Sequence, residues 1–360
     1  MPPITRNFGW RCVRAVQRGV TLVELLIAMV ISLVVIIAAS SVYLISGQSF
    51  NTVDAGSQLQ DSARFGTYIL RRMVQQAGFE DYSEFAANQS RAKSASVASI
   101  DEVCVQTDVC GFNNRVVTVA QIKSGNAGTT GTLIGPFYTD TLAVQFQGQS
   151  PIVSDGAGGG TPKKNADSTI MADGSMIDCS GNPYPASVTS PPDRAMSVLF
   201  VALRVAGEPE LYCTSKASDT GAGRAAVPLV RGVEVFKVMY EVGTDTDGDG
   251  TPDQFRWVRA DQVKNLAIAV KPSDNAVSQE VFNWQNVVAV RFGMVIRGEP
   301  GSATKVDIAT GPKTLYPLGT DLSDAANPGS IYVPPNDTRL RRVVTFTTHI
   351  RNKSSAFSQK

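Results

Sequence analysis

The chain has 360 residues, of which 43% are hydrophobic and 18% are charged, so it has enough apolar material for a sizeable core. Its 31 glycines and 19 prolines indicate many turns. The formal net charge is only +1 and no basic patch stands out, which argues against a nucleic-acid-binding protein.

The first 45 residues combine a basic leader with an apolar run. Four arginines and no acidic residue lie within residues 1–19. Leu25 to Ile45 then gives twenty-one residues without a charge. As a helix this run would be about 32 Å long, enough to cross a bilayer. The positive leader predicts that residues 1–19 stay in the cytoplasm and that the rest of the chain is exported.

A single acid, Glu24, stands at the head of the apolar run. A carboxylate in or near hydrocarbon is costly and therefore indicates a functional site. One simpler interpretation is a secretory signal peptide cleaved near residues 38–40, Ala-Ala-Ser, but its apolar core would exceed the usual length of roughly 7 to 15 residues. A plain membrane anchor is the other.

Residues 19–25, Gly-Val-Thr-Leu-Val-Glu-Leu, resemble the processing site of type IV prepilins and pseudopilins. In that family a membrane aspartyl peptidase cuts after the glycine and methylates the new N-terminus. The resemblance implies cleavage between Gly19 and Val20, with the prepilin peptidase as a partner. The family most often has Phe at the new first position, so Val20 is a departure that bears on methylation more than on cleavage.

The resemblance also implies an assembly role for Glu24. After cleavage Val20 would carry a positive amine in the membrane zone, and Glu24 is the nearest acid able to neutralise such a charge. Within one helix the geometry is poor, but between staggered subunits of a filament the two groups can meet. An ion pair in a low dielectric is strong only if its partner is present, so this pairing would favour assembly over a lone subunit.

The five cysteines divide between the leader and the exported part. Cys12 would be removed with the leader, which leaves an even number in an exported domain: Cys104, Cys110, Cys179 and Cys213. Of the three pairings that four cysteines allow, we favour Cys104 with Cys110 and Cys179 with Cys213. The alternative to disulfides is a zinc site, but the sequence has no Cys-x-x-Cys spacing and only one histidine.

An amphipathic pattern continues the helix beyond the apolar run. Six small or apolar residues recur at helical spacing on one face: Leu59, Ala63, Gly66, Leu70, Met73 and Ala77. We expect one helix from Thr21 to Ala77, about 85 Å long, capped by Gly78. Gly47 and Gly56 are the positions where we expect this helix to be weakest. The predicted segments are the leader 1–19, a membrane or filament-core half 20–46, an amphipathic half 47–78 and a β-rich exported domain 79–360.

From residue 79 onward the apolar period changes to two, which indicates strands. The expected strands cover residues 115–122, 142–146, 198–205, 211–213, 233–242, 255–259, 288–296 and 344–350. Strands without intervening amphipathic helices predict an α+β fold in which an antiparallel sheet packs on the long helix. Residues 148–168 and 298–336 are expected to be loops.

Further blocks resemble, in order, the PilW family of type IV pilus minor pilins. They are residues 61–65, 76–79, 140–144, 211–213, 228–233, 284–291 and 341–344. The resemblance implies the type IV pilin fold and a low-abundance subunit that joins other minor pilins and the major pilin in a priming complex at the filament tip. Such a subunit starts pilus assembly and supports adhesion or twitching motility, with a tip adhesin as a possible further partner. It would lie in the inner membrane of a Gram-negative bacterium before assembly and in the surface pilus afterwards.

One acidic loop carries chemistry of its own. Carboxylates at loop positions 1, 3, 5 and 9 and a backbone carbonyl at position 7 predict a calcium site formed by Asp245, Asp247, Asp249, Asp253 and Thr251. The glutamate expected at position 12 of an EF-hand is replaced by Arg256. The alternative is an acidic hairpin turn, since Asp and Gly are common turn residues. Four carboxylates within nine residues repel one another unless a cation screens them, which favours calcium.

No motif indicates an enzyme. The only histidine, His349, falls in a strand-like run and is expected to face solvent. The sequence has no Gly-x-Ser-x-Gly elbow, no His-Glu-x-x-His and no P-loop. The remaining alternatives are a pseudopilin of a type II secretion machine, which shares the processing site and the helix, and a membrane-anchored periplasmic binding protein.

Overall fold

The structure is a computed structural model of the chain. It describes residues 19–79, 108–112, 139–154, 160–185, 194–203, 208–216, 226–247, 252–263, 265–266, 279–303 and 310–352. Several sequence predictions lie outside the described residues: the leader up to residue 18, the strand over 115–122, and Cys104, Asp249 and Thr251.

Helix α1 (Leu22–Gln76) is continuous over 55 residues and is not interrupted at Gly47 or Gly56. It contains a stretch apolar enough and long enough to cross a membrane. Contacts divide the chain after Asn51, so the C-terminal part of α1 belongs to the globular unit that begins at Thr52. In that part the helix buries the face predicted from the spacing of residues 59–73.

The C-terminus of α1 has a glycine cap. Gly78 has φ of 70°, a left-handed conformation that glycine adopts without a steric penalty. Its N–H donates to the carbonyl of Gln145 at 2.9 Å, which joins the end of the helix to a strand. The chain therefore turns directly from α1 into the β-rich part.

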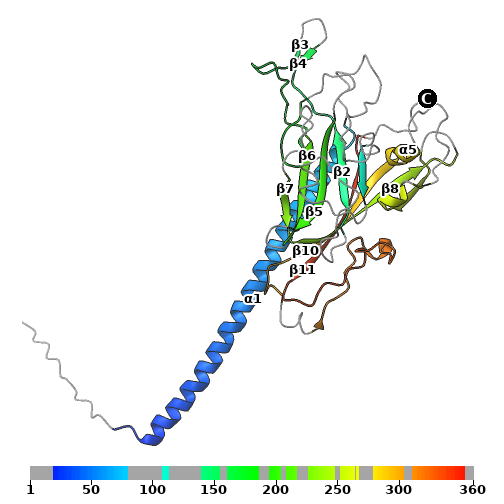
Figure 1. Cartoon of the computed structure of the whole chain (residues 1–360). Helices are drawn as coiled ribbons and strands as arrows, with labels where there is room; N and C mark the ends of the chain where they lie inside the picture. The colour runs from blue at the N-terminus through cyan, green and yellow to red at the C-terminus, as the bar shows by residue number, and fades with distance from the viewer. Residues whose placement is uncertain are drawn as a thin grey trace, which may run out of the picture. The chain divides into compact units, whose positions relative to one another are not determined.

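The first sheet is antiparallel and has five strands in the order β1-β2-β5-β6-β7 (Figure 1). Its strands are β1 (Val109–Phe112), β2 (Thr141–Phe146), β5 (Ala195–Leu203), β6 (Pro209–Lys216) and β7 (Val227–Arg231). All six residues of β2 are buried, as are the first seven of β5, so both faces of the sheet are covered at its centre.

The second sheet has four strands in the order β11-β10-β8-β9. Its strands are β8 (Val233–Thr244), β9 (Gln254–Val258), β10 (Val287–Arg297) and β11 (Arg341–His349), with short helices α4 (Ala260–Val263) and α5 (Gln279–Gln285) before β10. Strands β10 and β11 pair over nine residues from Ala289↔His349 to Arg297↔Arg341. His349 is exposed. The sequence predicted one antiparallel sheet on the helix, but the structure has two sheets there. Strand β7 ends the first sheet, and after a tight turn at Gly232 the next strand, β8, pairs in the second sheet.

Residues 148–168, predicted to be a loop, contain a small hairpin of β3 (Ile152–Ser154) and β4 (Gly160–Pro162). The prediction was wrong there because the glycines that suggested a loop also allow close strand pairing: a Cβ at Gly160 would lie 2.1 Å from the Ile152 side chain. Within the predicted loop 298–336, residues 310–336 are largely irregular, with one short 3₁₀ turn, η2 (Thr320–Leu322). Tyr332 of this segment packs on Val235 and Val295.

The core lies between α1 and both sheets. Leu70 and Val74 of the helix, Leu142 and Leu199 of the first sheet and Phe292 of the second are all fully buried in one cluster. Gly66 permits the close approach, since a Cβ there would lie 3.2 Å from Val230 Cγ2. The fold is therefore α+β, with a long N-terminal helix packed on antiparallel sheets.

Candidate assembly site

The start of α1 is a capping box made by Thr21 and Glu24. The Thr21 backbone N–H donates to Glu24 Oε2 at 2.9 Å, and its hydroxyl donates to the same oxygen at 3.1 Å. The Glu24 N–H lies 3.3 Å from Thr21 Oγ1. These reciprocal bonds satisfy donors that a helix start leaves free, and they fix the first helical residue at Leu22.

The capping box gives Glu24 a partner within its own helix. The Thr-x-x-Glu spacing is a sequence signature of such a box, and sequence reasoning centred on the charge of Glu24 missed it. Gly19 and Val20, the expected cleavage pair, lie just before the helix in non-helical chain. Because Thr21 and Glu24 both follow the expected cleavage bond, the box would remain in the processed chain.

The N-terminal part of α1 exposes a continuous apolar surface. Large side chains between Leu22 and Ile45 are exposed by 53% to 79%. Contiguous apolar surface of this extent is rare on soluble monomers and marks contact with lipid or protein. This surface is therefore suited to contact with lipid or with other apolar helices.

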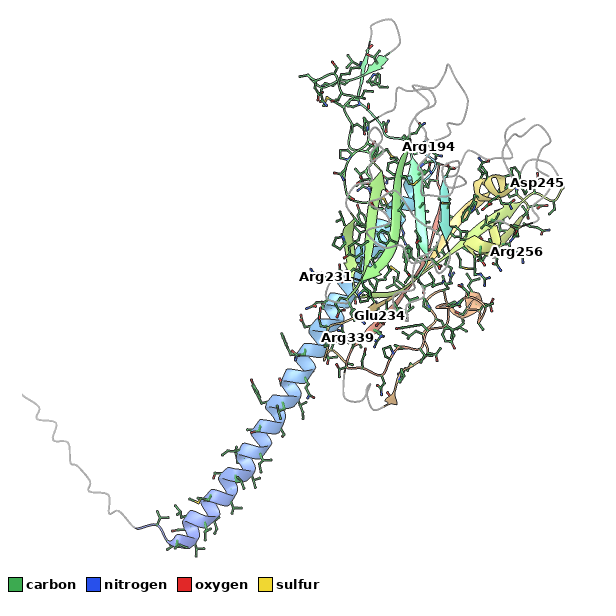
Figure 2. The ribbon with its side chains drawn as sticks, viewed as in Figure 1. Arg194, Arg231, Glu234, Asp245, Arg256 and Arg339 are labelled. Atoms are coloured by element: carbon green, nitrogen blue, oxygen red, sulfur yellow. A yellow bond between two sulfur atoms is a disulfide. The ribbon has the colours of Figure 1, made fainter. Side chains whose placement is uncertain are left out.

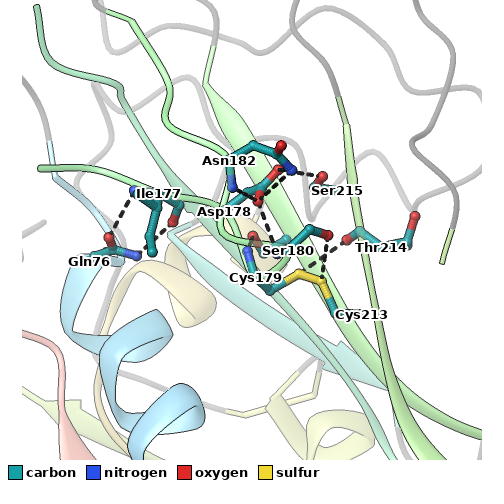
Figure 3. Close-up of a disulfide and its surroundings, with 10 residues drawn as sticks. Gln76, Ile177, Asp178, Cys179, Ser180, Asn182, Cys213, Thr214 and Ser215 are labelled. Atoms are coloured by element: carbon teal, nitrogen blue, oxygen red, sulfur yellow. Dashed lines mark hydrogen bonds between the residues drawn. A yellow bond between two sulfur atoms is a disulfide. The ribbon is translucent and has the colours of Figure 1, made fainter. Parts of the chain in front are cut away.

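A disulfide joins Cys179 to Cys213 in the globular unit (Figure 3). Their Cα atoms lie 6.0 Å apart, and both residues are buried. Asp178 supports the connection, since its carboxylate accepts from Ser215 Oγ at 2.6 Å and from the Asn182 N–H at 2.8 Å. Cys110 is also disulfide-bonded, while Cys104, its expected partner, lies outside the described residues.

The same segment is bonded to the end of α1. Gln76 Nε2 donates to the carbonyl of Ile177 at 3.0 Å, and the Ile177 N–H donates back to Gln76 Oε1 at 3.2 Å (Figure 3). The last turn of α1 is thereby connected, through two residues, to the disulfide. This places a covalent crosslink beside the C-terminal end of α1.

An ionic cluster joins β8 and β10 to β11 and the segment before it, and Glu234 of β8, labelled in Figure 2, lies at its centre. Glu234 is fully buried and accepts from Arg341 Nε at 2.7 Å, and Arg297 Nη1 lies 3.2 Å from its other oxygen. Tyr332 donates its hydroxyl to Glu234 at 3.1 Å. Hydrogen bonds from Arg341 hold the pKa of Asp337 below its usual value. Both carboxylate oxygens of Glu234 accept hydrogen bonds from side chains of the same domain, which indicates a structural role.

The acidic loop joins β8 to β9, whose ladder ends at Thr244↔Gln254. Asp245 is buried, and Asp253 accepts hydrogen bonds from the backbone N–H and hydroxyl of Thr246. Within the described part of the chain, no group of three or more His, Cys, Asp or Glu residues is placed to hold a metal ion. Asp249 and Thr251 lie outside that part, so the structure describes three of the five predicted ligands: Asp245, Asp247 and Asp253.

Two protein-family models match this chain. The prokaryotic N-terminal methylation motif matches residues 14–40, which contain Gly19, Val20 and Glu24. The family described as Type IV Pilus-assembly protein W, PilW, matches residues 198–352. The chain matches the PilW family. That match covers β8, β9, β10 and β11 together with Glu234, Arg297 and Arg341, so the ionic cluster lies entirely within the PilW region.

Among solved structures, a type IV-like pilin from Thermus thermophilus is similar to this chain, with 11% identity and a TM-score of 0.35. The similarity covers 82% of this chain and 96% of that one. No curated protein matches the chain. Neither matched family is described as a family of enzymes.

Proposed function

We propose that the chain is a minor pilin that initiates type IV pilus assembly as part of a tip priming complex. The observation that carries the proposal is the methylation motif at the head of one unbroken helix whose first half is apolar and exposed, followed by a PilW-type domain. In this role the chain supports adhesion and twitching motility as part of the filament rather than as an enzyme.

Processing precedes assembly in this proposal. The prepilin peptidase cleaves between Gly19 and Val20 and methylates Val20, and the chain waits in the inner membrane as a single-pass protein. The Glu24 carboxylate, held through one oxygen by Thr21, meets the amine of a neighbouring subunit during assembly. Desolvation makes a lone charge costly in the bilayer, so the pairing drives the subunit out of lipid and into the filament.

The partners are other minor pilins and the major pilin, with a tip adhesin bound to the exposed domain. Two alternatives have the same helix: a type II secretion pseudopilin and a membrane-anchored periplasmic binding protein. Deleting the gene and scoring surface pili against secreted exoproteins separates them. A loss of pili with normal secretion supports the minor pilin, whereas a secretion defect with normal pili supports the pseudopilin and an effect on neither supports the binding protein.

We also propose that the loop between β8 and β9 binds calcium through Asp245, Asp247, Asp249, Asp253 and the carbonyl of Thr251. Affinity should be modest, in the range of about 10⁻⁴ to 10⁻³ M typical of extracellular modules. Calcium should raise the melting temperature of the wild-type chain, and Asp247→Ala should abolish that rise. If calcium does not change the melting temperature of the wild-type chain, the proposed site is wrong.

A further inference from the structure

Asp140 and Lys237 form a buried pair that connects the two sheets. Asp140 directly precedes β2 of the first sheet, and Lys237 lies in β8 of the second. The Lys237 ammonium is 2.6 Å from Asp140 Oδ1, and the two side chains are 0% and 2% exposed. Taking both charges out of water is costly, so an ion pair at this depth is weak evidence of stabilisation. The pair also holds an amine against a carboxyl group, which are the two reactants of an amide.

Backbone hydrogen bonds fix the carboxyl group in place. The Asp140 N–H donates to the carbonyl of Phe236 at 2.7 Å, and Thr139 forms a parallel bridge with the same residue. The second carboxylate oxygen, Oδ2, accepts from the Val238 N–H at 2.9 Å. Asp140 is therefore bonded to the residues immediately before and after Lys237, and its two oxygens have different partners.

The distance between the two groups suits a condensation. The Asp140 carbon Cγ is one C–O bond, about 1.2 Å, from Oδ1, so the Lys237 nitrogen is at most about 3.8 Å from that carbon. Reacting atoms roughly 3 to 3.5 Å apart are in a near-attack arrangement. Because the fold holds both groups together, the reaction needs no bimolecular encounter, which removes a large part of the barrier.

The surroundings favour the neutral amine that can attack. Burial lowers the pKa of Lys237, although the charge of Asp140 opposes this effect. Arg259 and Asp261, which pair with each other at 3.0 Å, act on the pKa of Lys237 in opposite directions. Burial and the charge of Asp140 raise the pKa of Tyr240, so this phenol stays neutral beside the pair.

We propose that Lys237 and Asp140 condense to an amide that crosslinks the two sheets. Lys237 Nζ gives one proton to Oδ1 and attacks Cγ, which forms the Nζ–Cγ bond. The nitrogen then gives a second proton to Oδ1, the Cγ–Oδ1 bond breaks, and Oδ1 leaves as water. Both protons come from the ammonium, so no further reactant is needed.

The other carboxylate oxygen has a donor where charge develops. During the attack negative charge builds up on Asp140 Oδ2, which the Val238 N–H already contacts and can stabilise. The product replaces two buried charges by one neutral amide, which removes the cost of keeping ions in a low-dielectric interior. Desolvation therefore favours both the attack and the product.

The amide would be a second kind of covalent closure in the domain, besides disulfides. It joins residues 97 positions apart in sequence, and a reductant that opens the bond between Cys179 and Cys213 leaves it intact. It forms within one folded chain, so the inference does not depend on the proposed function.

Mass spectrometry of the full chain, purified from membranes in detergent and then reduced, tests the inference. The wild-type chain should be one water lighter than the sequence that follows its observed N-terminus. Trypsin should not cleave after Lys237, because the amine is blocked. Residues 232–256 should then be recovered joined to residues 124–163, which contain Asp140.

Lys237→Arg is the matched control. It keeps the positive charge, but a guanidinium stays protonated and does not condense, so the variant should have the full mass of its sequence. The wild-type digest decides the question whether or not the variant folds. Wild-type chain of full mass that trypsin cleaves after Lys237 would overturn the inference. So would a water lost within one peptide, as at an Asp-Gly succinimide, while the Lys237 amine is free.

Discussion

At the scale of single residues, Glu24 has one interaction in the structure, the capping box, and a second one in our proposal, the pairing of its charge between subunits. One carboxylate oxygen, Oε2, closes the capping box with Thr21, and the charge is what a neighbouring amine would pair with. A glutamine can still accept the capping bonds, whereas an alanine cannot. The two interactions can therefore be separated by substitution.

Glu24→Gln keeps the capping acceptor and removes the charge, while Glu24→Ala removes both. We expect both variants to be cleaved at Gly19 and both to be incorporated poorly into filaments, because the ion pair needs the charge. Immunoblots of sheared pili and of membranes measure incorporation and processing. Normal piliation of either variant would count against the ion-pair role.

Asp337 makes the stability of the domain depend on pH in the acid range. Its pKa is lowered in the folded chain by hydrogen bonds from Arg341, so its contribution to stability is present above its unfolded pKa. That contribution is lost as pH falls below about 3.8 through the lower folded value. Asp337→Asn should therefore lower the melting temperature at pH 7 and flatten its fall below pH 4. Asp321→Asn, at an exposed position of η2, is the matched control and should leave the profile unchanged.

At the scale of elements, α1 was the most predictable part of the chain. The spacing of residues 59–77 and the capping glycine Gly78 predicted its buried face and its end to within a residue. Strand β10 was predicted from its alternation, and β8 was expected over residues 233–242. The partition into two sheets was not predictable, because it depends on long-range contacts such as the buried pair of Lys237 with Asp140, 2.6 Å apart and 97 residues apart in sequence.

The disulfide between Cys179 and Cys213 lies next to the end of α1 and should stabilise the whole globular unit. It closes a loop with a sequence separation of 34 residues, for which chain entropy alone predicts about 3 to 4 kcal/mol. Cys179→Ser with Cys213→Ser should lower the free energy of unfolding by about that amount in urea titrations of the detergent-solubilised chain. Unfolding at the wild-type urea concentration would contradict a stabilising role.

At the scale of the whole molecule, the sequence separated cleanly into an N-terminal helix with a pilin-type start and a β-rich domain matched by PilW. The helix half is defined by strictly local signals: arginines, one glycine, one acid and an uncharged run. The acidic loop shows the limit of such reasoning, because carboxylate spacing alone does not say whether Asp253 binds a cation or accepts from Thr246, as it does in the structure.

Processing at the start of α1 is the event on which the assembly proposal depends. The most direct measurement is the N-terminus of the natural protein, isolated from membranes and pili and analysed by mass spectrometry. A chain that begins at Val20, with a methylated amine, is the predicted result. A chain that keeps its first nineteen residues, or that is cut near Ala39, would contradict the account.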